Sequence, residues 1–97
     1  MALGGKQKNA LRKMAHTLRP VVMIGQAGLT EGVIDETIGR LAHHELIKVK
    51  VSAGDRERRQ QLVETLCQRC EAELVQVIGA MAVLYRPARP PVIKLPR

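Results

Sequence analysis

Aromatic residues are nearly absent from this 97-residue sequence, which contains one tyrosine, Tyr85, and no tryptophan or phenylalanine. The sequence therefore excludes the class of nucleic-acid-binding proteins that stack bases on several aromatic side chains of a sheet. Cysteine is scarce as well, because Cys67 and Cys70 are too few for the disulfide framework of a small secreted domain. The sequence thus predicts a protein of a reducing compartment.

Long apolar runs are also missing. No run approaches the length of a membrane-spanning helix, and residues 1–13 lack the apolar segment of a signal peptide. We therefore expect a soluble cytoplasmic protein that has no membrane partner. With 45% apolar residues, the chain is long enough for one hydrophobic core and too short for two.

Acidic residues are absent from both ends of the chain. Residues 1–20 carry five bases and residues 84–97 carry four, while all nine acids lie between these segments with the other seven bases. The net charge of +7 is therefore concentrated at the ends. Clustered cations attract a polyanion, because binding releases the counterions held by its phosphates. A solvated basic surface that only keeps the protein in solution is the alternative.

The spacing of apolar residues predicts three helices. A basic amphipathic helix is expected within residues 6–18 and ends before Pro20, since the residue before a proline avoids the helical conformation. Thr30 and Asp55 are placed to cap the second and third helices. The apolar positions of the three helices are Leu11, Met14, Ala15 and Leu18; Val33, Ile34, Ile38, Leu41 and Ala42; and Leu62, Val63, Leu66, Cys67 and Cys70.

Four strands are expected between and after these helices. Residues 21–24 predict a short strand buried on both faces, and residues 46–52 predict one with alternating faces. Residues 74–78 and 81–86 predict a hairpin closed by Gly79-Ala80, a pair suited to a type II′ turn. In the second strand the outward, basic positions are Lys48 and Lys50.

These elements follow the order α-β-α-β-α-β-β. A parallel crossover followed by a helix and a hairpin predicts an α/β (α+β) fold, a small four-stranded mixed sheet packed against helices. We assign residues 1–86 to this domain. Residues 87–97 form a proline-rich, basic tail that either follows the sheet edge through Val92 and Ile93 or is loose.

A glycine-flanked loop, Gly25-Gln26-Ala27-Gly28, lies where the first strand meets the second helix. N–H groups at such a junction lack intrahelical partners and the helix dipole favours negative charge there, so the place suits a phosphate. The loop lacks the further glycine of a dinucleotide site and the lysine and hydroxyl of a P-loop. A clamp on successive nucleotides of single-stranded RNA, as in KH domains, fits better. A tight turn that binds nothing is the alternative.

Four segments occur in a distinctive order and spacing: KQKNALRKMAH, LRPVVMIGQAGLTEGVIDE, HHELIKVKV and VQVIGAMAVLYRP. In them the chain resembles the bacterial YhbY family, single-domain members of the CRM (chloroplast RNA splicing and ribosome maturation) group. The resemblance implies a fold like the C-terminal domain of translation initiation factor three and RNA binding through the GxxG loop and adjacent basic surface. It also implies association with precursors of the large ribosomal subunit. Inside the loop Gln26-Ala27 is not basic, so the charge must come from neighbouring residues.

We therefore predict that the loop and the surrounding bases form a single cationic surface for the ribosomal RNA (rRNA) of a large-subunit precursor. Binding is expected to follow backbone and shape, with no DNA specificity, and the protein is expected to be a monomer. The candidate RNA-binding residues are Gly25, Gln26, Ala27, Gly28, Lys6, Lys8, Arg12, Lys13, His16, Arg19, Lys48, Lys50 and Arg86. Secondary candidates are Arg56, Arg58 and Arg59.

No catalytic or metal-binding constellation emerges from the sequence. Cys67 and Cys70 lie on the apolar stripe of a helix and predict buried thiols. Zinc would need two more ligands, and His43 and His44, the nearest histidines, are expected to splay apart on a helix. We therefore predict no enzymatic activity, no cofactor and no metal. The alternative to RNA binding is a protein-interaction adaptor of the same fold that binds an acidic protein.

Overall fold

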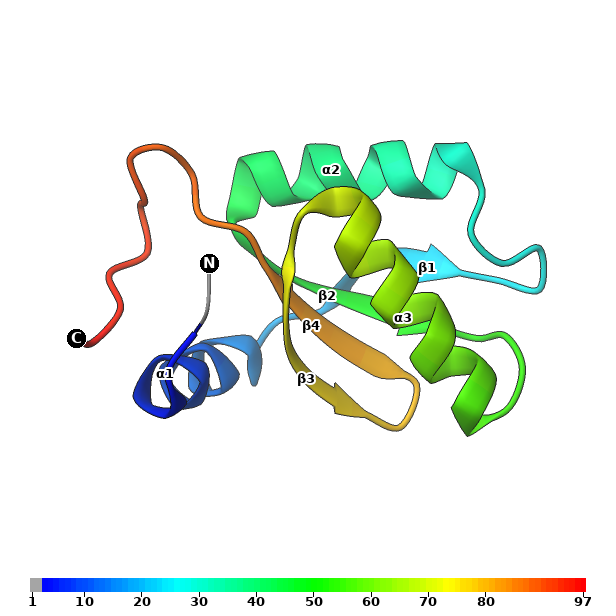
Figure 1. Ribbon diagram of the computed structural model, residues 1–97, viewed down its shortest axis with the longest axis horizontal. Coiled ribbons are helices and arrows are strands. Elements are labelled where there is room, and N and C mark those ends of the chain that lie inside the picture. Colours follow the sequence, from blue (N-terminus) through cyan, green and yellow to red (C-terminus); the bar gives the residue numbers. More distant parts are fainter. Residues whose placement is uncertain (1–2) are drawn as a thin grey trace.

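The structure is a computed structural model that describes residues 3–97; the first two residues of the predicted domain lie outside this range. Within it, helices and strands follow one another in the predicted order (Figure 1). Their bounds are α1 Gly5–Ala15, β1 Pro20–Ile24, α2 Glu31–His44, β2 Leu46–Val51, α3 Arg56–Cys70, β3 Glu73–Ile78 and β4 Met81–Tyr85.

Local signals in the sequence set the starts of α2 and α3. Thr30 Oγ1 accepts a hydrogen bond from the Val33 N–H at 3.1 Å, and Asp55 Oδ1 accepts one from the Arg58 N–H at 2.9 Å. Each cap satisfies an N–H group that has no partner within its helix. Gly79 has a φ of 57° in the β3–β4 turn, the positive value that a type II′ turn requires at this position.

The strands form one mixed sheet in the order β1-β2-β4-β3. Strands β1 and β2 are parallel because α2 crosses between them, whereas β4 is antiparallel to both β2 and β3. The predicted α+β architecture is confirmed.

Helices cover the two faces of this sheet unequally. On one face, α2 and α3 pack against Ile47, Val49 and Val51, the predicted inward positions of β2. On the other face, α1 contacts β2 and β3, and its Leu11 is fully buried in a second apolar cluster. Figure 1 shows α1 near the C-terminal end of the molecule, while the β1–α2 loop lies at the opposite end of the long axis.

The expectation that β1 is buried on both faces is wrong. Val22 and Ile24 point into the core, but Met23 is 58% exposed. The reason is the position of α1, which lies over β2 and β3 and leaves the same face of the edge strand β1 open. An apolar run alone does not reveal this, because burial on the second face depends on a distant helix.

Helix α2 buries a polar residue that apolar spacing missed. Thr37 is fully buried, and its hydroxyl donates to the Val33 carbonyl at 2.7 Å. This bond satisfies the hydroxyl within the helix, so that burial costs little. Ala42, predicted on the apolar face, is exposed instead.

The C-terminal segment, residues 87–97, is held against the domain by one carboxylate. Glu45 is 3% exposed, and its two oxygens accept hydrogen bonds from the N–H groups of Ala88 at 2.7 Å, Val92 at 3.1 Å and Ile93 at 2.8 Å. Ile93 and Leu95 pack against the cluster beneath α1. The segment is thus docked on Glu45 and on the cluster beneath α1, without the strand pairing that following the sheet edge would give, and Val92 is exposed.

Replacement of Glu45 with glutamine is expected to lower the free energy of unfolding by about 1–3 kcal/mol, because a charged acceptor of several N–H groups is lost. Burial raises the pKa of the Glu45 carboxyl, but the three N–H donors outweigh it and hold the pKa below its ordinary value of 4.5. The stabilisation is therefore complete above the unfolded pKa and is lost as pH falls through the folded one.

Urea unfolding of the wild-type and Glu45→Gln proteins between about pH 3 and pH 7 measures this difference. Hydrogen exchange at the amides of Val92 and Ile93 should accelerate in the variant. A stability difference that stays constant with pH would contradict the role given to the carboxylate.

Candidate nucleic-acid interface

Gly28 ends the tight turn of the β1–α2 loop. Its N–H donates to the Gly25 carbonyl at 3.0 Å, and its φ of 74° is one that glycine adopts far more readily than other residues. Gly28 is buried, and a side chain there would meet Arg58 and Leu62. This glycine is therefore needed by the turn itself.

Gly25, at the start of the loop, is different. It is exposed, its φ lies outside the left-handed region, and a Cβ built on it would meet nothing within 4 Å. The turn does not require a glycine here, so the missing side chain leaves the main chain open to close approach from outside. Gln26 and Ala27 are exposed beside it, and Gln26 Nε2 donates to the Ser52 carbonyl at 3.2 Å, which ties the loop to the β2–α3 connection.

The positive charge beside the loop comes from α3. The Arg58 guanidinium lies 3.6 Å from the position that a Cβ on Gly28 would occupy. Arg59 is turned inward by comparison, since its Nη1 donates to the Gly54 carbonyl at 3.1 Å. Arg58, named only as a secondary candidate, thus lies beside the predicted clamp.

The N-terminus of α2 carries a carboxylate that the sequence reasoning did not weigh. Glu31 begins the helix, where its negative charge competes with a phosphate for the helix dipole. Arg69 of α3 binds both oxygens of Glu31, at 3.0 and 3.1 Å. This ion pair occupies the N-terminal end of α2. The part of the junction that stays accessible to a phosphate is therefore the exposed main chain of residues 25–27.

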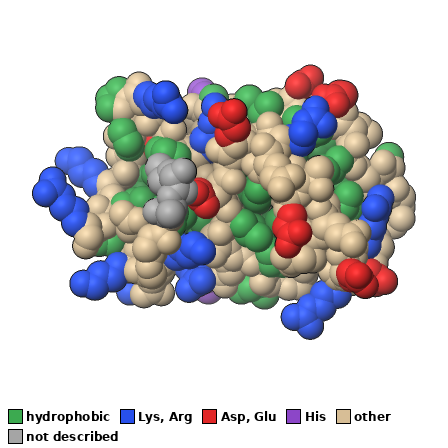
Figure 2. All heavy atoms as spheres, in the orientation of Figure 1, with side chains coloured by type: hydrophobic (Ala, Val, Ile, Leu, Met, Phe, Trp, Pro, Cys, Tyr) green, Lys and Arg blue, Asp and Glu red, His purple; other side chains and the backbone are tan. Residues whose placement is uncertain are grey.

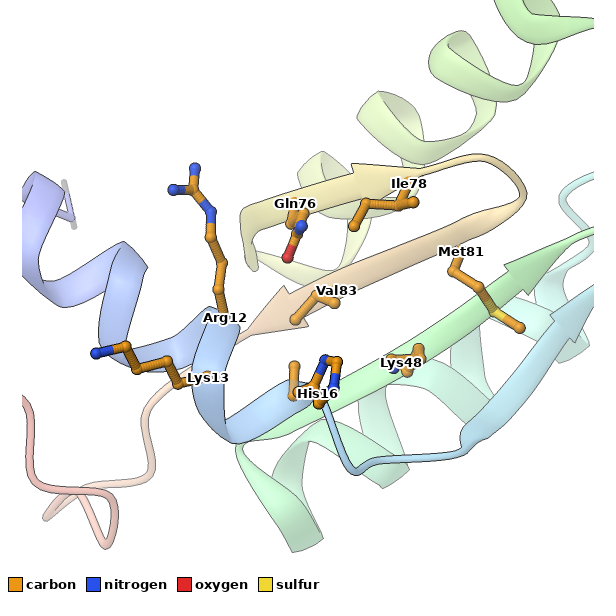
Figure 3. A pocket seen from close by; sticks show the side chains of 9 residues that line it. Arg12, Lys13, His16, Lys48, Gln76, Ile78, Met81 and Val83 are labelled. Carbon is orange, nitrogen blue, oxygen red and sulfur yellow. The ribbon is translucent and has the colours of Figure 1, made fainter.

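A basic hollow of about 510 Å³ lies on the α1 side of the sheet, beside the C-terminal turn of α1 (Figure 3). Its lining residues are Arg12, Lys13, Ala15, His16, Lys48, Gln76, Ile78, Met81 and Val83. None of them is acidic. Figure 3 shows the Arg12 and Lys13 side chains extending outward from α1, while Ile78, Met81 and Val83 lie along the sheet.

Strand β2 connects this hollow with the loop. Lys48 is paired with Val83 of β4, and Lys50 is paired with Met23 of β1 and Met81 of β4. Both lysines therefore point to the α1 side of the sheet, as the alternation predicted. At about 3.3 Å per residue, the backbone from Lys48 to Ser52, where Gln26 is bound, covers about 13 Å.

The prediction that the loop and the surrounding bases form a single cationic surface is corrected by this arrangement. Helix α1 and the loop lie at opposite ends of the long axis, which measures 38 Å, and Lys48 and Lys50 belong to β2, which runs between them. On the face drawn in Figure 2, Lys and Arg gather at the end formed by α1 and the C-terminal segment, and carboxylates are interspersed over α2 and α3. The tertiary fold thus forms two basic groups joined by β2.

Five predicted bases do not line the hollow, and one of them, Lys50, lies next to it on β2. Lys6 and Lys8 belong to the first half of α1, and Arg19 borders a second hollow between α1 and β1. Arg86 has an internal contact instead, since its Nη1 donates to the Cys70 carbonyl at the end of α3 at 3.3 Å. Its Nη2 also lies 4.0 Å from a Glu71 carboxylate oxygen. A cation at a helix C-terminus satisfies a free carbonyl and complements the dipole.

Comparison with known proteins is decisive for the family, because residues 3–86 match the CRS1/YhbY (CRM) domain. The chain belongs to the CRS1/YhbY family. It is 50% identical over 95 residues to a Haemophilus influenzae protein named "RNA-binding protein", covering 98% of this chain and 96% of that one. A Pseudomonas aeruginosa relative, likewise named for RNA binding, is 44% identical over 86 residues, which cover 89% of this chain and 83% of the relative.

A solved structure has the same fold as this CRS1/YhbY chain. The solution structure of a Staphylococcus aureus protein, described as a candidate RNA binder, superposes with a TM-score of 0.85 at 42% identity. The match covers 98% of this chain and all of the other. The resemblance noted in the sequence is confirmed at the level of family and fold.

The two cysteines are buried free thiols, as predicted. Burial raises the pKa of the Cys67 thiol to about 12, and burial also raises that of Cys70 despite the opposing effect of Arg86 and Arg69. Both thiols are therefore protonated near neutral pH and are poor nucleophiles.

The rings of His43 and His44 do not splay apart, because their centroids lie 5.0 Å from each other in an edge-to-face arrangement.

Over residues 3–97, no group of three or more histidine, cysteine or acidic side chains is arranged to hold a metal ion. In the same part of the chain no helix has both the length and the apolar content needed to cross a membrane.

Proposed function

We propose that this CRS1/YhbY protein binds RNA along a path from the exposed β1–α2 loop, across Lys48 and Lys50 of β2, to the C-terminal half of α1. Its relatives in Haemophilus influenzae and Pseudomonas aeruginosa are named for RNA binding. In line with the family resemblance, we place its RNA on a precursor of the large ribosomal subunit, as an assembly factor in the cytoplasm.

The observation that carries this proposal is the basic row on the α1 side of the sheet. Lys48 and Lys50 point to the same side as Arg12 and His16, and the hollow between them contains no acidic side chain. Gly25, at the end of this row, offers main chain without a side chain. A phosphate backbone can follow such a path by charge and close approach, with little dependence on base sequence.

Removing the two β2 charges should reduce the salt dependence of RNA binding. Each lost phosphate contact with a single strand lowers the slope of log affinity against log salt by about 0.7, so Lys48→Gln with Lys50→Gln should lower it by about 1.4. Fluorescence anisotropy of a labelled rRNA fragment at several salt concentrations measures the slope. Arg40→Gln is the matched control, because Arg40 is exposed on α2, on the other face of the sheet.

Sucrose-gradient sedimentation of a cell lysate tests the ribosomal part of the proposal. We expect the protein to migrate with the large-subunit precursor and to leave it after RNase treatment. A complex that survives RNase would support the adaptor alternative, in which the basic surface binds an acidic protein. A salt slope near zero for the wild-type protein would contradict RNA binding itself.

A further inference from the structure

The hollow beside α1 has an apolar floor as well as a basic rim. Strand pairing places Met81 of β4 next to Ile78 of β3, and Val83 next to Gln76. Ile78 is 65% exposed although it lies within a strand, and nothing in residues 3–97 covers it. Phosphate binding accounts for the basic rim but not for the exposed apolar floor. The floor therefore indicates that the ligand also has an apolar part.

The chemistry of the rim complements the phosphate of a nucleotide. Arg12 and Lys48 supply positive charge at the edge of the hollow, and none of its lining residues is acidic. The Gln76 amide offers both a donor and an acceptor beside the apolar floor. An apolar, polarisable surface next to an amide and several cations complements a base, its polar edge and its phosphate. Methionine sulfur also makes favourable contacts with π-systems. Met81 can therefore contact the face of a base, as aromatic side chains do in other RNA-binding proteins.

The base must be unpaired to reach this floor. In an RNA duplex the bases are stacked inside the helix and the deep, narrow major groove keeps side chains out, so a sheet cannot contact their faces. The floor lies on strands β3 and β4, behind the rim formed by α1 and Lys48. A nucleotide that has left the stack can place its base on the floor while its phosphate stays at the rim.

We propose that the hollow between α1 and the sheet binds one unpaired RNA nucleotide, with the base on Met81 and Ile78 and the phosphate near Arg12 and Lys48. This proposal rests on the RNA binding proposed above and adds a preference for bulged or looped RNA. The loop at Gly25 grips backbone, whereas the hollow distinguishes an extruded base from a paired one.

The test compares two RNA hairpins that differ by one bulged 2-aminopurine nucleotide in the stem. Wild-type protein should bind the bulged hairpin more tightly, and the 2-aminopurine fluorescence should change on binding as the base leaves its neighbours. The double variant Ile78→Gln with Met81→Gln keeps every charge. We expect its affinity for the bulged hairpin to fall roughly fivefold to tenfold, at the low end of the cost of losing one stacked base, with the paired hairpin unaffected.

Val92→Gln is the matched control, because Val92 is an exposed apolar residue outside the hollow. Ile78→Gln alone guards against misfolding of the double variant, since its side chain already lies mostly in solvent. If wild-type protein binds both hairpins equally, or the variants lose both equally, the nucleotide site is refuted while RNA binding stands. If wild-type protein binds neither hairpin, the proposed function fails as well.

Discussion

Replacing Gly25 with aspartate is expected to weaken RNA binding roughly tenfold to a hundredfold while the free energy of unfolding stays nearly unchanged. Gly25 is exposed, its φ is accessible to other residues, and a Cβ there would meet nothing within 4 Å. The fold therefore tolerates a side chain. A carboxylate at this point repels a phosphate that approaches the main chain of residues 25–27.

Gly25→Asn and Gly25→Ala separate charge from volume in this experiment. Asparagine has nearly the same shape as aspartate without its charge, so it should cost less affinity than aspartate does. Equal losses for both would mean that volume alone blocks the approach. Unchanged affinity in all three variants would remove the loop from the interface. Gly28 is a poorer position for this test, because its φ of 74° and its burial make any side chain there a folding defect.

Replacing Gly54 with alanine is expected to destabilise the protein by about 2–4 kcal/mol. Gly54 has a φ of 70°, and a Cβ there would collide with the Cβ and Cγ atoms of Arg58. Neither atom is the far end of a flexible side chain, so the first turn of α3 must shift. Arg58 lies beside the β1–α2 loop, so the shift should also disturb the charge at Gly28.

Thermal unfolding followed by circular dichroism measures this effect, which corresponds to a fall in Tm of about 10 °C or more for a domain of this size. Gly39→Ala is the matched control with the opposite sign. Gly39 lies within α2 and has open space at its Cβ position, so alanine there should stabilise by about 0.5–1 kcal/mol. A Gly54→Ala protein as stable as the wild type would show that the α3 start is free to move.

Electrostatic partners were the part of the candidate site that sequence reasoning identified least well. Arg86 was grouped with the RNA-binding bases because it belongs to the acid-free end of the chain, yet its guanidinium contacts the end of α3. Arg58 was only a secondary candidate, yet it lies beside Gly28. Charge patterning counts bases along the chain, but the direction of each side chain depends on which elements pack against it.

Glu45 is a further feature that the sequence left unmarked. A lone glutamate after a helix reads as a solvated residue, whereas here it is buried and binds N–H groups 43 to 48 residues later in the chain. In the structure Glu45 is the C-cap of α2, where a φ of 62° turns the chain directly into β2.

Elements and their order followed from the sequence by itself, because caps, turns and apolar alternation act between residues that are close along the chain. Thr30, Asp55 and the β2 alternation illustrate this, and each appears in the structure as predicted. Only the tertiary structure decided that α1 packs on the sheet face opposite α2 and α3, and that its bases lie at the far end from the GxxG loop. The choice of face depends on packing between segments far apart in the chain, which local pattern does not encode.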